Sequence, residues 1–218
     1  MKSLVAAIAL SCVALTGAQA AIVNFGTLGQ SVQDCTFTCT TRLQQDYAAS
    51  FFGSQSVNIS EVSFYTGGGF INGSSVYSMY LSTNPHGSTL VPTFSQNVSS
   101  DRVLFATLTT TAFAAGNVNF FGSFAYDPTK GNLIVDIVNS NPGFSSAFSS
   151  TNNVNRVYQF DASSSGEVDN GYGLATSFVT GASNAVPEPG TVALLGLGLL
   201  GVIASRRKSS KNTNAQAA

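Results

Sequence analysis

The sequence has few charged side chains and little of the chemistry that enzymes use. Only 9% of its 218 residues are charged, against about 25% in an ordinary soluble domain, and the formal net charge is −1. This balance argues against a highly charged disordered chain and against a basic nucleic-acid binder. The chain has one His, three Cys and no Trp, but 16 Phe and 21 Gly. Packing residues and turn residues therefore dominate over catalytic ones.

The motifs of common catalytic sites are also missing. No Gly-x-Ser-x-Gly elbow occurs, and no Cys has the context of a catalytic nucleophile. The single histidine, His86, follows Asn84-Pro85 and precedes Gly87, so we expect it to lie exposed in a turn. We therefore predict a protein that is not an enzyme and that needs no cofactor.

The N-terminus has the pattern of an export signal. Lys2 precedes a nearly continuous apolar run over residues 4–15, which is too short to span a bilayer. Ala18 and Ala20 supply the small residues that signal peptidase requires, so we predict a signal peptide over residues 1–20 and cleavage before Ala21.

The C-terminus carries a second short apolar segment between distinctive flanks. The stiff motif Pro187-Glu188-Pro189 precedes an apolar run over residues 190–205, and the basic cluster Arg206-Arg207-Lys208 follows it. As a helix this run would rise about 24 Å, and snorkelling of the basic side chains could make up the difference to a bilayer core of about 30 Å. We predict a single transmembrane helix here, with the basic cluster on the cytoplasmic side.

This order of features resembles the PEP-CTERM sorting signal of exported proteins in many Gram-negative bacteria. The resemblance covers residues 186–208 and implies recognition by exosortase, a membrane transpeptidase that cleaves near the Pro-Glu-Pro motif and removes the helix. It also implies an association with exopolysaccharide and biofilm, and related tails are found on some ice-binding proteins. The polar tail over residues 209–218 departs from the pattern, because family members often stop soon after the basic cluster. A plain membrane anchor that is never cut is the alternative.

The segment between the two ends is long enough for one domain with a core of its own. Residues 21–186 hold nine acidic and four basic side chains, a formal net charge of −5, so the segment has no electrostatic reason to bind nucleic acid or anionic lipid. We assign residues 21–181 to this domain and residues 182–185 to a flexible linker.

The periodicity of this domain is that of β-strands. Leu133, Val135 and Ile137 alternate with their neighbours so that one face of the strand is wholly apolar, and no amphipathic helical pattern appears. The remaining strand candidates are residues 22–28, 47–52, 57–65, 76–83, 102–109, 117–126, 154–160 and 172–179. Their number and spacing predict an all-β, antiparallel sandwich or jelly roll.

Small polar residues mark the expected turns and loops. Gly67-Gly68-Gly69 and Asn72-Gly73 are typical turn sequences, and residues 144–153 lack any periodicity. We therefore expect turns at the first two places and a surface loop at the third, with Phe144 and Phe148 as the residues that could anchor this loop to the domain.

Cys35 and Cys39 are the two cysteines that remain after removal of the signal peptide. Export to an oxidising compartment favours a disulfide between them. Four residues of extended strand span about 13 Å, whereas bridged Cα atoms lie within about 7 Å. The pairing therefore requires a turn over residues 36–38, and a strand there would keep the thiols apart.

Two further sets of residues have a functional and a structural interpretation. Asp161, Ser163 and Ser165, with Gly166 following, match the first half of a calcium loop, and Glu167 and Asp169 lie nearby, but Tyr172 stands where the bidentate Glu should be. An acidic hairpin turn is the favoured interpretation, and no metal site is predicted. A set of aromatic residues could form a sugar-stacking face or belong to the core: Tyr65, Tyr77, Tyr80, Phe120, Phe121 and Phe124.

Taken together, these features predict an exported protein of the cell surface or extracellular matrix. We expect a structural or adhesive role in exopolysaccharide or biofilm, with exosortase, the membrane during transit and the polysaccharide as partners. A carbohydrate-binding or ice-binding module is the alternative. A polysaccharide hydrolase is disfavoured because no acid–base constellation is recognisable.

Overall fold

A computed structural model describes residues 20–29, 32–33, 36–87, 89–143, 147–162 and 165–182. They belong to one compact unit, Ala20–Ser183. The predicted sorting motif, transmembrane helix and polar tail lie outside the described residues, as does the predicted signal peptide up to residue 19. The helices of the described part are three short 3-10 turns, and none of them could cross a membrane.

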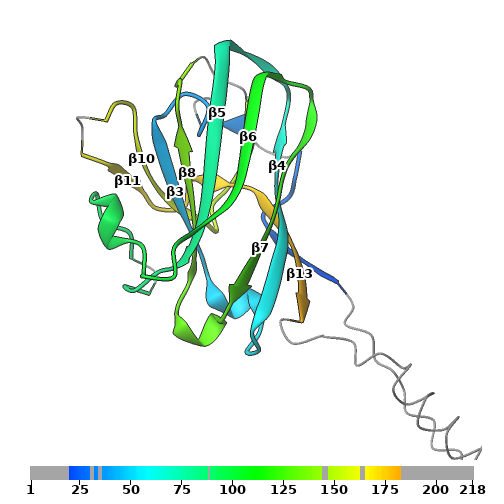
Figure 1. Cartoon of the computed structure of the whole chain (residues 1–218), viewed down its shortest axis with the longest axis vertical. Helices are drawn as coiled ribbons and strands as arrows, with labels where there is room; N and C mark the ends of the chain where they lie inside the picture. The colour runs from blue at the N-terminus through cyan, green and yellow to red at the C-terminus, as the bar shows by residue number, and fades with distance from the viewer. Residues whose placement is uncertain are drawn as a thin grey trace, which may run out of the picture. The chain divides into compact units, whose positions relative to one another are not determined.

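Two antiparallel sheets pack face to face as a sandwich, which confirms the predicted all-β class (Figure 1). The six-stranded sheet has the order β11 (Glu167–Asp169), β10 (Asn155–Gln159), β3 (Arg42–Tyr47), β8 (Leu133–Asn139), β5 (Gly69–Thr83) and β6 (Val103–Phe113). The seven-stranded sheet contains β1 (Ala21–Phe25), β13 (Thr176–Ala182), β4 (Val57–Thr66), β9 (Phe148–Thr151) and β12 (Gly173–Leu174), with β7 (Gly116–Tyr126) beside β4 and β2 (Val32–Gln33) beside β9. Consecutive strands β6 and β7 carry the chain from one sheet to the other.

Strand β8 shows how the sequence pattern places the core. Leu133, Val135 and Ile137 all face the space between the sheets and are buried in the main core, as their alternation predicts. The residues between them are buried too, because the segment between β5 and β6 covers the outer face of the sheet. Ile134 packs there against Leu90 and Phe94 of that segment. The six-stranded sheet is therefore covered on both faces at this point.

Phenylalanine rings fill the space between the sheets. Phe37 contacts five other rings at centroid distances of 4.7–6.3 Å, from Phe64, Tyr77, Phe113, Phe120 and Phe148. At the other end of the core, Phe178 of β13 contacts the rings of Phe25, Tyr47 and Phe52. Most of these pairs are edge-to-face or tilted, which is the arrangement that the charge distribution of aromatic rings favours.

Three local predictions from the sequence are wrong. Residues 47–52 are not a strand, because β3 ends at Tyr47 and the 3-10 helix η1 (Ala49–Phe52) follows and turns Phe52 into the core. Within the predicted surface loop over residues 144–153, residues 148–151 form strand β9, which pairs with β12, and Phe148 is fully buried. Asn72-Gly73 is not a turn but lies within β5, where the pairing with β6 changes register between Phe70 and Ser75. In each case contacts with distant strands outweigh the local preference.

The aromatic core gives a direct test of the fold. Phe178→Ala removes a fully buried ring that three other rings contact, so we expect the free energy of unfolding to fall by about 3–5 kcal/mol. Phe121→Ala removes a ring that is 66% exposed, and we expect a loss below about 1 kcal/mol. Urea unfolding of both variants measures the difference, and equal losses would contradict the packing described.

Candidate functional site

A buried carboxylate with two arginines lies on the outer face of the six-stranded sheet. Asp136 of β8 is fully buried and accepts two hydrogen bonds from Arg42, from Nε at 2.8 Å and from Nη2 at 2.7 Å. Arg102 forms a second ion pair with the same carboxylate, at 2.8 Å, and its guanidinium lies 3.6 Å from the centre of the Tyr80 ring. A single buried negative charge is thus compensated by two cations that keep partial contact with water. The sequence feature that pointed to this buried ion pair was an Asp between the apolar residues Val135 and Ile137 of a predicted strand.

Asp46 of β3 is a second buried carboxylate, and only amides bond to it. The side-chain nitrogens of Asn84 and Asn132 donate to its two oxygens, each at 2.7 Å. Burial raises the pKa of Asp46 to about 6, and the two amide hydrogen bonds offset only part of that rise. Asn132 also accepts a hydrogen bond from the backbone N–H of Ala49. The carboxylate therefore holds together three connecting segments of the sandwich.

Asp101 holds the segment between β5 and β6 against the end of β5. The hydroxyls of Ser82 and Thr83 donate to its carboxylate at 2.7 and 2.5 Å, and the backbone N–H of Thr83 adds a further hydrogen bond. Burial by itself would raise the pKa of Asp101, but these hydrogen bonds outweigh it and hold the pKa below its usual value. Like Asp46 and Asp136, this carboxylate is fully engaged in holding the fold.

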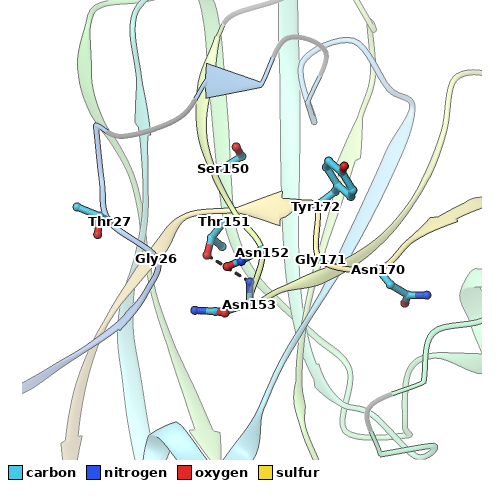
Figure 2. A pocket seen from close by; sticks show the side chains of 9 residues that line it. All are labelled: Gly26, Thr27, Ser150, Thr151, Asn152, Asn153, Asn170, Gly171 and Tyr172. Atoms are coloured by element: carbon cyan, nitrogen blue, oxygen red, sulfur yellow. Dashed lines mark hydrogen bonds between the residues drawn. The ribbon is translucent and has the colours of Figure 1, made fainter.

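An open hollow of about 710 Å³ lies where three turns meet. Its walls come from residues 26–27 after β1, residues 150–153 at the β9–β10 turn, and residues 170–172 before β12. Figure 2 shows Thr27 on one side and Tyr172 on the other, with Asn152 and Asn153 between them. The side chains that line the hollow carry amides, hydroxyls and one phenol, and none of them is charged at neutral pH. A smaller hollow of about 250 Å³ lies between β6 and β7.

The three acidic residues of the calcium hypothesis do not form a joint site in the described residues. Asp169 is paired with Arg156 at 2.7 Å, and Glu167 accepts a hydrogen bond from the hydroxyl of Tyr158 at 3.0 Å. Asp161 lies exposed just after β10, and Ser163 lies outside the described residues. In the part of the chain that the structure covers, no three His, Cys, Asp or Glu side chains are placed to hold a metal ion.

Cys39 is disulfide-bonded, and Cys35 lies outside the described residues. The segment before Cys39 is a turn and not a strand, since the backbone N–H of Cys39 donates to the carbonyl of Thr36 at 3.2 Å. This is the conformation that a bridge between positions 35 and 39 requires, and that pairing stays a prediction.

His86 lies in an exposed turn, as predicted, and the six aromatic candidates are divided between the core and the surface. Tyr77, Phe120 and Phe124 are buried in the core, so the six aromatic candidates do not form one exposed face. Tyr172, which the sequence did not single out among the aromatics, is 63% exposed and lies beside the polar hollow. A Tyr between glycines and asparagines in a turn was the available signal.

The C-terminal segment of the chain matches a known family of sorting signals. Residues 185–208 match the family described as the PEP-CTERM protein-sorting motif. The chain carries a PEP-CTERM sorting motif. This motif, which contains Pro187, Glu188 and Pro189 and extends to Lys208, implies processing by exosortase and export to the cell surface. No curated protein and no solved structure matches the chain.

The pKa of Asp46 leads to a prediction about stability. Its folded pKa lies above its unfolded value, so the folded state binds the extra proton, and this contribution to stability is complete below pH 3.8 and is lost as the pH rises through about 6. Relative to Asp46→Asn, the wild-type free energy of unfolding should fall by up to about 3 kcal/mol between pH 4 and 7. Urea titrations at several pH values measure the difference, and parallel profiles for the two proteins would contradict it.

Proposed function

We propose that this PEP-CTERM protein is a non-enzymatic structural or adhesive component of the extracellular matrix that acts together with exopolysaccharide. The sorting motif carries the proposal, because it implies export of the sandwich domain to the cell surface, and proteins with PEP-CTERM tails are generally associated with exopolysaccharide. An all-β domain with a continuous aromatic core suits a role that consists of binding and spacing rather than of a reaction cycle.

The placement of the ionisable groups supports a role without catalysis. The carboxylates of Asp46, Asp101 and Asp136 are bonded to amides, hydroxyls and guanidiniums within the fold. The two hollows described above are lined without a carboxylate, a histidine or a cysteine. Hydrolysis of a glycosidic bond ordinarily uses two carboxyl groups that flank the bond, and neither hollow offers even one. A polysaccharide hydrolase is accordingly the less favoured alternative.

The sorting step has a mass-spectrometric test. Mature protein recovered from its own host should lack the segment that contains Arg206, Arg207 and Lys208, because exosortase cuts near the Pro-Glu-Pro motif. The triple variant Pro187→Ala/Glu188→Ala/Pro189→Ala should keep that segment and stay in the membrane fraction. As a matched control, Asn212→Ala/Asn214→Ala in the polar tail should be processed like the wild type. Intact mass distinguishes the forms, and a mature wild-type protein that still contains Lys208 would contradict cleavage.

The matrix role has a test in the host. Deletion of the chain should lower the amount of polysaccharide retained on the cells, while the total polysaccharide in the culture and its chain length stay unchanged. The wild-type chain should restore retention, and the triple sorting variant should not. Size-exclusion chromatography and a reducing-end assay measure chain length. Shorter polysaccharide in the presence of the chain would instead support hydrolysis, and unchanged retention in the deletion strain would overturn the matrix role.

A further inference from the structure

We infer that the polar hollow formed by the three turns is a binding site for an uncharged saccharide. The inference rests on the proposed function and deepens it, because it names the surface of the domain and the chemical class of the ligand. At about 710 Å³ the hollow falls within the range of small-ligand sites, which are about 300–1,000 Å³.

The lining of the hollow indicates the class of ligand. Asn152, Asn153 and Asn170 each carry an amide that can both donate and accept hydrogen bonds, and Thr27 and Ser150 add hydroxyls. The hydroxyl groups of a sugar also donate and accept hydrogen bonds, so the amides and hydroxyls of the lining can bind them in either sense. A lining with no charged side chain offers no counter-ion for a phosphate, a carboxylate or an ammonium group.

Tyr172 supplies the apolar part of the recognition. Its side chain is 63% exposed although aromatic rings are usually buried for their large apolar area, and it stands at one side of the hollow (Figure 2). A pyranose ring has an apolar face of C–H groups that fits the flat face of a tyrosine. The combination of one exposed ring and several neutral amides therefore fits a sugar better than an ion or an apolar ligand.

The walls of the hollow are held in place before any ligand arrives. Gly26 and Gly171 adopt φ values of 77° and 73°, and a Cβ on Gly26 would approach Cβ of Thr151 to 2.6 Å. The N–H of Gly171 donates to the side chain of Asn155 at 3.0 Å, and the N–H of Asn153 donates to Oγ1 of Thr151 at 3.3 Å. A hollow whose turns are already ordered loses less conformational entropy on binding.

The hollow lies near the start of strand β13, and the last described residue of the domain lies at the other end of that strand. Thr176, at the start of β13, pairs with Phe25, which directly precedes Gly26 of the hollow. Ala182, the last described residue before the sorting motif, lies at the other end of β13, about 20 Å along the strand.

Nucleic acid is the competing ligand, because bases also stack on tyrosine and bond to amides. Nucleic-acid binding depends on neutralising phosphates with Lys and Arg, and it weakens steeply with salt. The hollow has neither residue, and the domain over residues 21–186 has a formal net charge of −5. The structure therefore favours the saccharide.

The test uses mature wild-type protein recovered from its host and three single variants. Tyr172→Ala and Asn152→Ala alter exposed turn positions of the hollow, and Phe121→Ala removes an equally exposed aromatic ring on β7, outside the hollow. The probes are a panel of uncharged glycans (glucans, galactans and mannans, as oligosaccharides and polymers), a polyuronate and single-stranded DNA. Circular dichroism confirms that each variant is folded, and affinity is measured at low and at high NaCl concentration.

We expect at least one uncharged glycan to bind with an affinity that changes less than about twofold with salt. Tyr172→Ala and Asn152→Ala should weaken that binding at least about tenfold, and Phe121→Ala should leave it within about twofold of the wild type. Binding only to the polyuronate or to DNA, no binding to any uncharged glycan, or equal affinity of Tyr172→Ala and wild type would overturn the inference.

The inference and the proposed function can fail separately. Tyr172→Ala should reach the cell surface, because the substitution leaves the sorting motif intact, but it should not restore polysaccharide retention in the deletion strain. If it restores retention fully, the site inference is wrong and the matrix role stands. If the wild-type chain itself does not restore retention, the proposed function is wrong.

Discussion

The packing of phenylalanine rings between the two sheets is the interaction on which the rest of the structure depends. Phe37, which follows the first short strands, contacts rings from β4, β5, β6, β7 and β9, and so it joins segments from the whole length of the domain. Burial of these rings, together with the aliphatic residues of the same core, removes a large apolar surface from water and so stabilises the fold. The turns around the polar hollow carry residues such as Asn152 and Tyr172, which are exposed and lie outside this core.

The outer face of the six-stranded sheet follows a different principle. Here the covering segment between β5 and β6 packs Leu90 and Phe94 against Ile134, and it also supplies Asn84 to Asp46 and Arg102 to Asp136. The second partners, Asn132 of Asp46 and Arg42 of Asp136, come from outside that segment. Removing one hydrogen-bonding partner from such a buried group costs more free energy than the intact interaction contributes to folding, because the remaining charge or donor stays buried and unpaired. The contacts of Asn84 with Asp46 and of Arg102 with Asp136 tie the covering segment to the sheet.

The sorting motif and the proposed saccharide site lie in different parts of the chain. The PEP-CTERM motif implies processing by exosortase and export to the cell surface, and it occupies one continuous stretch of sequence. The proposed saccharide site depends instead on tertiary structure, because its walls come from three separate stretches of the sequence: residues 26–27, 150–153 and 170–172. Strand β13 begins near the hollow and ends at Ala182, and the sorting motif follows later in the sequence.

The sequence by itself determined the sorting motif, the all-β class and the apolar face of β8, because each depends on order and spacing along a short stretch of chain. Only the tertiary structure decided that β3 is a central strand although its sequence, Arg-Leu-Gln-Gln-Asp-Tyr, is polar, since the partners of Gln44 and Asp46 come from remote segments. It also decided that Phe148 belongs to the core and Tyr172 to an exposed hollow. The reason is physical: whether an aromatic or a carboxylate is buried, paired or exposed depends on which distant residues lie against it, and local sequence carries little of that information.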